Sequence, residues 1–237
     1  MSPGAFVPFP EPRRFATFVG RRQRFLADVV LEDGTAVVAH CPNTGSMKGC
    51  LHPGRPALLW DSRNPARKLR YTWKAIEGEE GWIGVDTGVP NRLAEQAIRA
   101  GLLPALAGFT KIAREQPMGE RSRVDLVLSV PGTCYVEVKN VTLVEGGGAR
   151  FPDAVTARGR KHLEELAARV RAGHRAAMLY VVQRQDGRWF EPAEDIDPAY
   201  AQGLRHAVGA GVEVYVLGAR VTPEGVEGTG LLPVRGV

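Results

Sequence analysis

Hydrophobic and polar residues alternate most clearly between positions 123 and 139, where the chain reads RVDLVLSVPGTCYVEVK. A period of two is typical of a β-strand that buries one face. The turn residues Pro131-Gly132-Thr133 interrupt the alternation once, so this segment is predicted to be a β-hairpin. Its apolar face is expected to pack on the core and carries Val124, Leu126, Leu128, Val130, Cys134, Val136 and Val138.

The opposite face of the hairpin carries two acids and a lysine. Pairing Val130 with Cys134 across the turn sets the expected register. Asp125 then lies opposite Lys139, and Glu137 lies diagonally from Asp125 on the same face. A bulge of one residue in the loop would shift this register. The pattern predicts a cluster of Asp125, Glu137 and Lys139.

These residue types together suit metal-dependent chemistry. Carboxylates about 7–8 Å apart at the backbone can lean together and share one cation. Mg²⁺ or Mn²⁺ fits, because such ions take one or two carboxylates plus water and phosphate oxygens. The cation would polarise a phosphodiester, and Lys139 would orient the attacking water or stabilise the developing charge. The alternative is a solvated sheet face with an ordinary Asp–Lys pair. Only six of the 31 Lys and Arg residues are lysines, which favours a specific role for Lys139.

The first third of the chain shows only short strand patterns separated by turn residues. Five or six short strands in a basic segment are typical of a small OB-like β-barrel, although other small barrels give the same pattern. We therefore expect residues 1–86 to form an OB-like nucleic-acid-binding domain. The predicted strands are 15–19, 25–31, 35–41, 57–61, 69–76 and 82–86.

The rest of the chain, residues 87–237, alternates helical and strand patterns. Asn91 is a candidate N-cap for a helix that ends at Gly101. The order of elements predicts a mixed sheet flanked by helices, and hence an α+β protein overall. Beyond the first helix and the hairpin, the predicted elements are a strand at 109–115, a helix at 153–172, a strand at 176–182, a helix at 198–210 and a strand at 212–217.

Glu95 lies at the border of the apolar arc of the first predicted helix. It is a candidate third acid directed at the metal from this helix. A glutamate at such a border is also commonly solvated, and the sequence leaves both interpretations open.

Positive charge is concentrated in the first third of the chain. The net charge is +5, and positions 12–74 hold twelve Lys or Arg residues against four acids. Basic side chains neutralise phosphates and aromatic rings stack on unpaired bases, so the segment 62–74 is a candidate nucleic-acid surface. The alternative is a positive surface over two core aromatics. The candidate contacts are Arg63, Arg67, Lys68, Arg70, Tyr71 and Trp73.

Two further basic groups are candidates for the same partner. Lys48 follows the turn at 43–46, which resembles a phosphate-binding turn but lacks the spacing of a P-loop. We expect a structural turn that lines the nucleic-acid surface. The helix predicted at 153–172 carries Arg158 and Lys161, together with Arg160 and His162, in one stretch. These residues could contact phosphate near the metal or form a solvated helix face.

Several classes of protein are disfavoured by composition. The longest apolar run, 176–182, is too short to span a bilayer, and the N-terminus shows no signal-peptide pattern. The cysteines, Cys41, Cys50 and Cys134, show no C-x-x-C spacing. Cys41 and Cys50 could bridge or bind metal, but separate reduced thiols, and hence a cytoplasmic protein, are expected.

The predicted order αβββαβ, with Glu95 on the helix, Asp125 in the hairpin and an E-x-K at 137–139, resembles the PD-(D/E)XK nuclease superfamily. Val124 stands where that motif has proline. Longer segments resemble the sugar fermentation stimulation protein A family over nearly the whole chain. They are HCPNTGSMKGC (40–50), NPARKLRYTW (64–73), SRVDLVL (122–128), CYVEVKNVTL (134–143) and FPDAVTARGRKHLEEL (151–166).

This resemblance implies an N-terminal OB-like domain, a nuclease-like C-terminal domain, DNA binding and a link to sugar metabolism. Two functions follow. One is a largely sequence-nonspecific nuclease acting on DNA, or alternatively RNA, with Asp125 and Glu137 as ligands of Mg²⁺ or Mn²⁺. In it, Lys139 assists the water and Glu95 is an outer acid. The other is a non-catalytic DNA-binding regulator of sugar (maltose-type) metabolism genes. A degraded nuclease would be expected to lose one of the acids or the lysine, and all are present.

Overall fold

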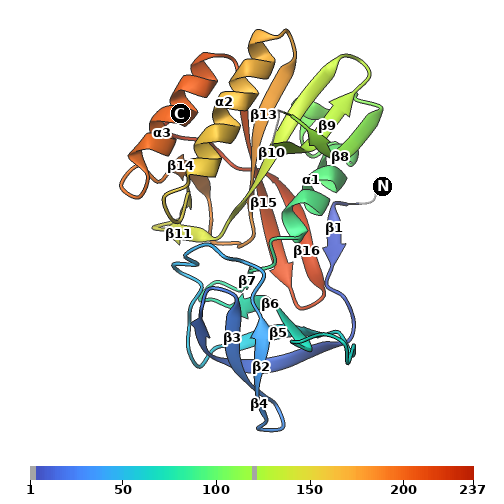
Figure 1. Ribbon diagram of the computed structural model, residues 1–237, viewed down its shortest axis with the longest axis vertical. Coiled ribbons are helices and arrows are strands. Elements are labelled where there is room, and N and C mark those ends of the chain that lie inside the picture. The colour runs from blue at the N-terminus through green and yellow to red at the C-terminus, as the bar shows by residue number, and fades with distance from the viewer. Residues whose placement is uncertain (1–3, 119–121) are drawn as a thin grey trace.

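A barrel of short strands and a larger α/β unit are stacked along the long axis of the protein (Figure 1). The computed structural model describes residues 4–118 and 122–237. The barrel contains β2 (Arg13–Arg22), β3 (Leu26–Leu31), β4 (Ala36–His40), β5 (Pro56–Asp61), β6 (Tyr71–Glu77) and β7 (Trp82–Gly84).

The barrel closes through one parallel pair. Its strands follow the order β4-β3-β2-β5-β6-β7, and β4 also pairs with β6, so the five strands β2 to β6 form a closed ring. The other neighbours are antiparallel. Phe18 and Trp73 stack in the interior with ring centroids 4.7 Å apart. The small OB-like barrel predicted from the sequence is confirmed.

The larger unit is built on a seven-stranded sheet with the order β1-β16-β15-β13-β10-β9-β8. The central strands β10, β13 and β15 are parallel, and the strands on either side are antiparallel. The strands are β1 (Phe6–Pro8), β8 (Lys111–Pro117), β9 (Arg123–Ser129), β10 (Thr133–Val141), β13 (Arg175–Val182), β15 (Glu213–Thr222) and β16 (Gly225–Leu231). A small second sheet contains β11 (Leu143–Glu145), β12 (Gly148–Phe151) and β14 (Trp189–Pro192).

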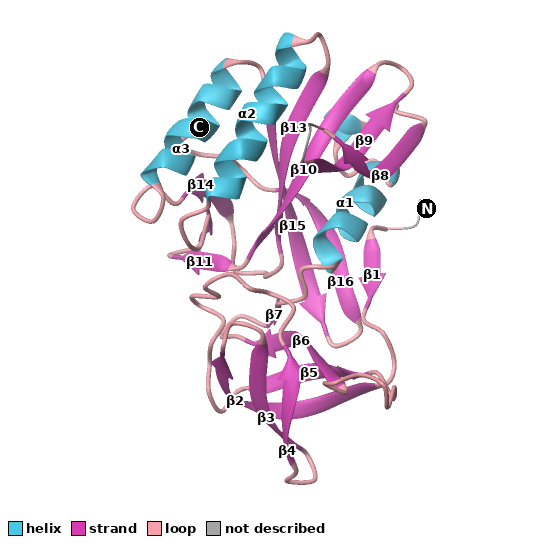
Figure 2. Cartoon of the chain, viewed as in Figure 1, coloured by secondary structure: helices cyan, strands magenta, loops and turns pink. Residues whose placement is uncertain are grey.

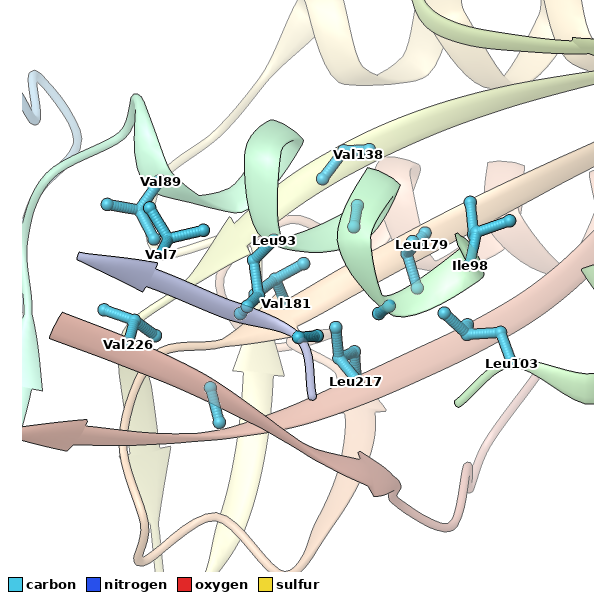
Figure 3. Packing of buried hydrophobic residues seen from close by; sticks show 14 of the residues in the cluster. Val7, Val89, Leu93, Ile98, Leu103, Val138, Leu179, Val181, Leu217 and Val226 are labelled. Atoms are coloured by element: carbon cyan, nitrogen blue, oxygen red, sulfur yellow. The ribbon is translucent and has the colours of Figure 1, made fainter. Parts of the chain in front are cut away.

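Helices cover both faces of the large sheet (Figure 2). On one face, α1 (Val89–Arg99) and the short η1 (Pro104–Leu106) pack on alternate residues of β13, including Leu179 and Val181 (Figure 3). On the other face, α2 (Ala157–Arg171) and α3 (Pro198–Gly209) pack on the intervening residues. A strand buried on both faces has no polar side, which is why β13 reads as a continuous apolar run.

The order α1-β8-β9-β10-α2-β13 confirms the predicted αβββαβ arrangement. The helix starts differ from the prediction. Helix α1 begins at Val89 with Pro90 in its first turn, so Asn91 lies inside the helix and is not its cap. Helix α2 begins after Thr156, whose side chain accepts a hydrogen bond from the Gly159 N–H at 3.0 Å.

The predicted hairpin is present, but its register differs from the prediction by two residues. Ser129 pairs with Thr133. Val130 lies in the turn with φ of 61°, donates its N–H to Gly132 O and is 51% exposed. The predicted Val130–Cys134 pair and the core position of Val130 are therefore wrong. Two residues are one full period of a strand, so every other residue keeps its predicted face.

Hydrogen bonds join the two units. The backbone N–H of Gly84 donates to Gln183 O at 2.8 Å, and the side-chain Nη1 of Arg184 donates to Gly49 O at 3.3 Å. Strand β1 pairs with β16, so the first strand of the chain belongs to the large sheet, although the sequence analysis grouped it with the barrel. No described helix is long and apolar enough to cross a membrane.

The three cysteines are buried and free, in line with the expectation of separate reduced thiols. Burial raises the pKa of Cys50 to about 11 and that of Cys134 to about 12. We therefore expect the native thiols to react with a disulfide reagent at pH 8 at least about tenfold more slowly than the unfolded chain, because the thiolate is the reactive form. Absorbance assays with and without guanidinium measure this, and a rapid native reaction would contradict it.

Candidate metal centre

Asp125 lies on β9, and both oxygens of its carboxylate are held by neighbouring groups. Oδ1 accepts a hydrogen bond from Asn91 Nδ2 at 2.8 Å, and Oδ2 accepts one from the Val138 N–H at 2.8 Å. Burial raises the pKa of Asp125, and the nearby charge of Glu137 raises it further. The strand pair and helix α1 together fix the position of this carboxylate.

Glu137 lies on the adjacent strand β10 and is 2% exposed. Its Oε1 accepts a hydrogen bond from Lys139 Nζ at 2.5 Å and contacts Nδ1 of His162. Among the described residues, its buried Oε2 has no hydrogen-bond partner. Burial would raise the pKa of Glu137, but the bond to His162 and the charge of Lys139 outweigh burial and lower it. The side chain is therefore an anion with one unused oxygen.

The structure thus brings Asp125, Glu137 and Lys139 together on one face, as the sequence analysis expected. If the ladder of β9 and β10 is extended with the observed register, Asp125 lies opposite Glu137 rather than opposite Lys139. This places the two carboxylates closer than the predicted diagonal arrangement.

The donor groups fit a hard divalent cation. A buried carboxylate oxygen without a partner costs free energy, which a bound cation would offset. Each Asp125 oxygen accepts one hydrogen bond and keeps a second lone pair. Mg²⁺ and Mn²⁺ prefer such oxygen ligands. In the part of the chain that the structure describes, no three His, Cys, Asp or Glu side chains are grouped to hold a metal ion. Other ligands would have to be backbone, water or substrate oxygens.

Glu95 does not join this cluster. Its carboxylate pairs with Arg99 at 2.9 Å and with Arg114 of β8. Burial would raise the pKa of Glu95, but these two arginines lower it. The expectation that Glu95 points at the metal is therefore not supported, since its charge is already neutralised.

Neither Asn91 nor His162 was predicted from the sequence to contact the carboxylates of the centre. Asn91 lies one helical turn before Glu95 and is the residue of this helix that contacts Asp125. His162 of α2 is 3% exposed and contacts Glu137. The spacing of four residues between Asn91 and Glu95 was the available signal, because residues four apart share a helix face.

The predicted basic surface corresponds to the loop between β5 and β6. Arg63 and Lys68 are exposed there. Arg70 forms an ion pair of 2.7 Å with the buried Asp61, and Arg67 donates to Thr72 Oγ1 at 3.1 Å. OB folds bind oligonucleotides with loops at this place, so the position fits a nucleic-acid surface.

The two aromatic residues expected to stack on bases lie in the barrel core. Trp73 is fully buried, and Tyr71 is 9% exposed. The expectation of base stacking is wrong for Trp73, because both faces of β6 are covered. Trp60, near the same basic loop, is a partly buried aromatic residue. Arg67 Cζ and Lys74 Nζ lie 5.1 Å and 5.4 Å from the centroid of its ring.

The turn at 43–46 is tied to the rest of the chain. The N–H of Gly45 donates to Asn43 Oδ1, and the N–H of Met47 donates to Asp153 Oδ2, each at 2.9 Å. Because these donors already have protein partners, a structural turn fits better than a phosphate cradle. Lys48 beside it is exposed and pairs with Glu145 at 3.0 Å.

The basic residues of α2 differ in their surroundings. Arg158 lies beside the metal centre, because its Nε donates to His162 Nε2 at 3.4 Å. Lys161 is exposed and pairs with Glu165 at 3.6 Å. Arg158 is therefore the better placed of the two to meet a substrate at the centre.

Comparison with known families gives two matches that divide the chain as the structure does. The SfsA N-terminal OB domain matches residues 19–85. The sugar fermentation stimulation protein RE domain matches residues 88–225. The chain belongs to the sugar fermentation stimulation protein family.

Individual relatives agree with this assignment. A sugar fermentation stimulation protein homolog of Geobacter metallireducens is 56% identical over 227 residues, which cover 95% of this chain and 98% of the relative. A homolog of Geotalea uraniireducens is 53% identical over 227 residues, with the same coverage. The solved structure of Pyrococcus furiosus SfsA in complex with Ca²⁺ is similar over 97% of this chain and 98% of that chain, with 30% identity and a TM-score of 0.87. The family predicted from the sequence is confirmed.

Proposed function

We propose that this protein binds DNA with little sequence preference and hydrolyses its phosphodiester bonds with the help of Mg²⁺ or Mn²⁺. The observation that carries the proposal is the buried Oε2 of Glu137, which lacks a partner among the described residues. The same side chain pairs with Lys139 through Oε1, and its charge raises the pKa of the neighbouring Asp125. The Ca²⁺ complex of the Pyrococcus furiosus relative supports a divalent cation in this family.

Each residue of the centre has a distinct role in this proposal. Asp125 and Glu137 hold the cation, and Asn91 holds Asp125. A cation bound there supplies a Lewis acid and lowers the pKa of water. Lys139 reaches Glu137 through Nζ without occupying Oε2, so its charge remains available to the water or to the phosphate.

The barrel supplies the DNA contacts in this proposal. Its exposed basic residues, such as Arg63 and Lys68, attract phosphate, and phosphate contacts carry no direct sequence information. RNA is the alternative polymer, since the same contacts suit it. The free buried thiols fit a reducing compartment, so we propose the cytoplasm.

The proposal is tested by incubating purified protein with labelled single- and double-stranded DNA in Mn²⁺, Mg²⁺ or EDTA. Cleavage that appears with a cation and is absent in EDTA is the expected result. Matched RNA substrates in the same assay identify the preferred polymer. Absence of cleavage under all these conditions would contradict the catalytic part.

A non-catalytic DNA-binding regulator of sugar (maltose-type) metabolism genes is the second candidate. The sugar fermentation names of the relatives favour it. DNA binding with a preference for particular promoter fragments and no cleavage would support this candidate over the first.

DNA affinity should fall steeply with salt, because binding to phosphates releases counterions. We expect Lys68→Ala to weaken binding uniformly across sequences and to reduce the salt slope by about one. Fluorescence anisotropy between 50 and 300 mM salt measures both quantities, and Lys111→Ala in the other unit serves as the matched control. Equal affinity at both salt concentrations would contradict the electrostatic account.

A further inference from the structure

His162 is buried on α2, and its Nδ1 contacts Oε1 of Glu137, the oxygen that also binds Lys139. We propose that His162 is a positioning residue that holds Glu137 so that Oε2 stays available to the cation. The inference rests on the proposed function, because it assumes a cation at this centre. It assigns a role to a residue that touches neither substrate nor metal.

Two neighbours of His162 are consistent with the same position of its ring hydrogen. Glu137 Oε1 belongs to an ionised carboxylate and can only accept, so the hydrogen lies on Nδ1. The other ring nitrogen faces Arg158. The Nε of Arg158 always bears a hydrogen and can only donate, and it lies 3.4 Å from His162 Nε2. Nε2 therefore accepts, and in a neutral ring the hydrogen is then on Nδ1. Nδ1 donates to Glu137 Oε1. Lys139 Nζ lies 3.2 Å from Nδ1, so two donors converge on one acceptor oxygen.

This arrangement restricts the rotation of Glu137. Turning the carboxylate to exchange its oxygens would break the contacts of Oε1 with both His162 and Lys139. Oε2 remains the oxygen without a protein partner in the described chain. Residues that orient a metal ligand in this way commonly affect metal affinity about 10- to 100-fold.

The start of α2 is held firmly enough for this role. A Cβ on Gly159 would lie 3.0 Å from the Tyr200 ring and 2.7 Å from Thr156, so α2 packs closely against α3 here. The Thr156 N–H donates to Asp197 Oδ2 at 2.8 Å, and Arg160 donates to the same carboxylate. The direction in which Arg158 and His162 project is therefore set by packing.

The experiment compares His162→Asn, His162→Gln and His162→Ala by calorimetric titration with Mn²⁺ or Ca²⁺ in the absence of DNA. The amide nitrogen of Asn can occupy the place of Nδ1, whereas that of Gln reaches the place of Nε2. We expect Ala and Gln to weaken cation binding about 10- to 100-fold, and Asn to stay within about threefold of the unmodified protein. Equal affinity of the unmodified protein and the Ala variant would overturn the inference.

The outcomes separate this inference from the proposed function. If the unmodified protein binds neither cation, the proposed function fails; if it binds and all variants bind equally, only the role of His162 fails. Melting temperature and DNA affinity in EDTA report on folding. If the Ala variant does not fold, the comparison of Asn with Gln decides. If no variant folds, His162 is a packing residue and the inference is overturned.

Arg158→Met provides an independent check. Removing the Nε donor takes away the contact at Nε2 that helps to hold the His162 ring in place beside Glu137, so we expect cation affinity to fall several-fold without DNA present. An unchanged cation affinity would overturn the role of Arg158 in holding His162.

Discussion

Changing Lys139 to Met is expected to slow DNA cleavage about 100-fold or more, while the protein still binds the cation and keeps nearly the same DNA affinity. The ammonium group of Lys139 would stabilise charge that develops during the reaction, and single groups of this kind typically contribute such factors. Met keeps the volume of the side-chain stem. Glu137 Oε1 would keep its contact with His162. Single-turnover cleavage rates and a cation titration measure the two effects separately.

Glu137→Gln is the matched variant, because it removes the negative charge beside the cation with little change in shape. Here we expect loss of both cation binding and cleavage, with DNA affinity in EDTA retained, since the basic loop lies in the barrel. Trace cleavage that survives both changes would come from a contaminant and would favour the regulator. Loss of DNA binding in both variants would contradict the proposal that the barrel binds DNA while the metal centre cleaves it.

The grouping of the central residues of the site could be predicted, because it depends only on which face of its strand each residue occupies. Asp125, Glu137 and Lys139 share a face in any register that differs by an even number of residues. The observed register differs from the predicted one by two, so the cluster survives the error. The same argument explains why strands with clear patterns were located well.

The residues that helices contribute could not be predicted in this way. Which helical residue meets Asp125 depends on the rotation and start of α1, and these are set by packing on the sheet. The residue that contacts Asp125 is Asn91. Glu95 instead forms an ion pair with Arg114 of the edge strand β8. Strand β16 was missed for a local reason: its sequence GVEGTGL is rich in glycine, which weakens a strand pattern.

The barrel and the metal centre are connected through the start of α1. Lys74 of the barrel forms a buried ion pair of 2.7 Å with Asp86. Asp86 also accepts the Gly88 N–H at 2.9 Å, directly before α1. Asn91 in the first turns of this helix then holds Asp125. Contacts of the barrel thus help to fix the position of Asn91, which in turn orients the candidate metal ligand Asp125.

Trp73→Ala is expected to destabilise the protein by about 3–5 kcal/mol, as truncation of a large core aromatic usually does. Trp73 is fully buried, stacks on Phe18 and donates its ring N–H to Ala75 O at 2.9 Å. Its removal would leave a cavity in the barrel and remove the hydrogen bond to Ala75 O. Urea unfolding measures the change in free energy.

Trp60→Ala is the matched control for Trp73→Ala, because Trp60 is only partly buried and lies beside Arg67 and Lys74 on the basic side of the barrel. We expect it to cost less than about 1 kcal/mol of stability. If its ring meets unpaired bases, it should weaken binding of single-stranded DNA by about 1–3 kcal/mol. In the opposite pattern, the Trp73 variant would be stable but lose DNA affinity, and the Trp60 variant would keep it. That result would indicate that Trp73 stacks on bases and would contradict its buried position.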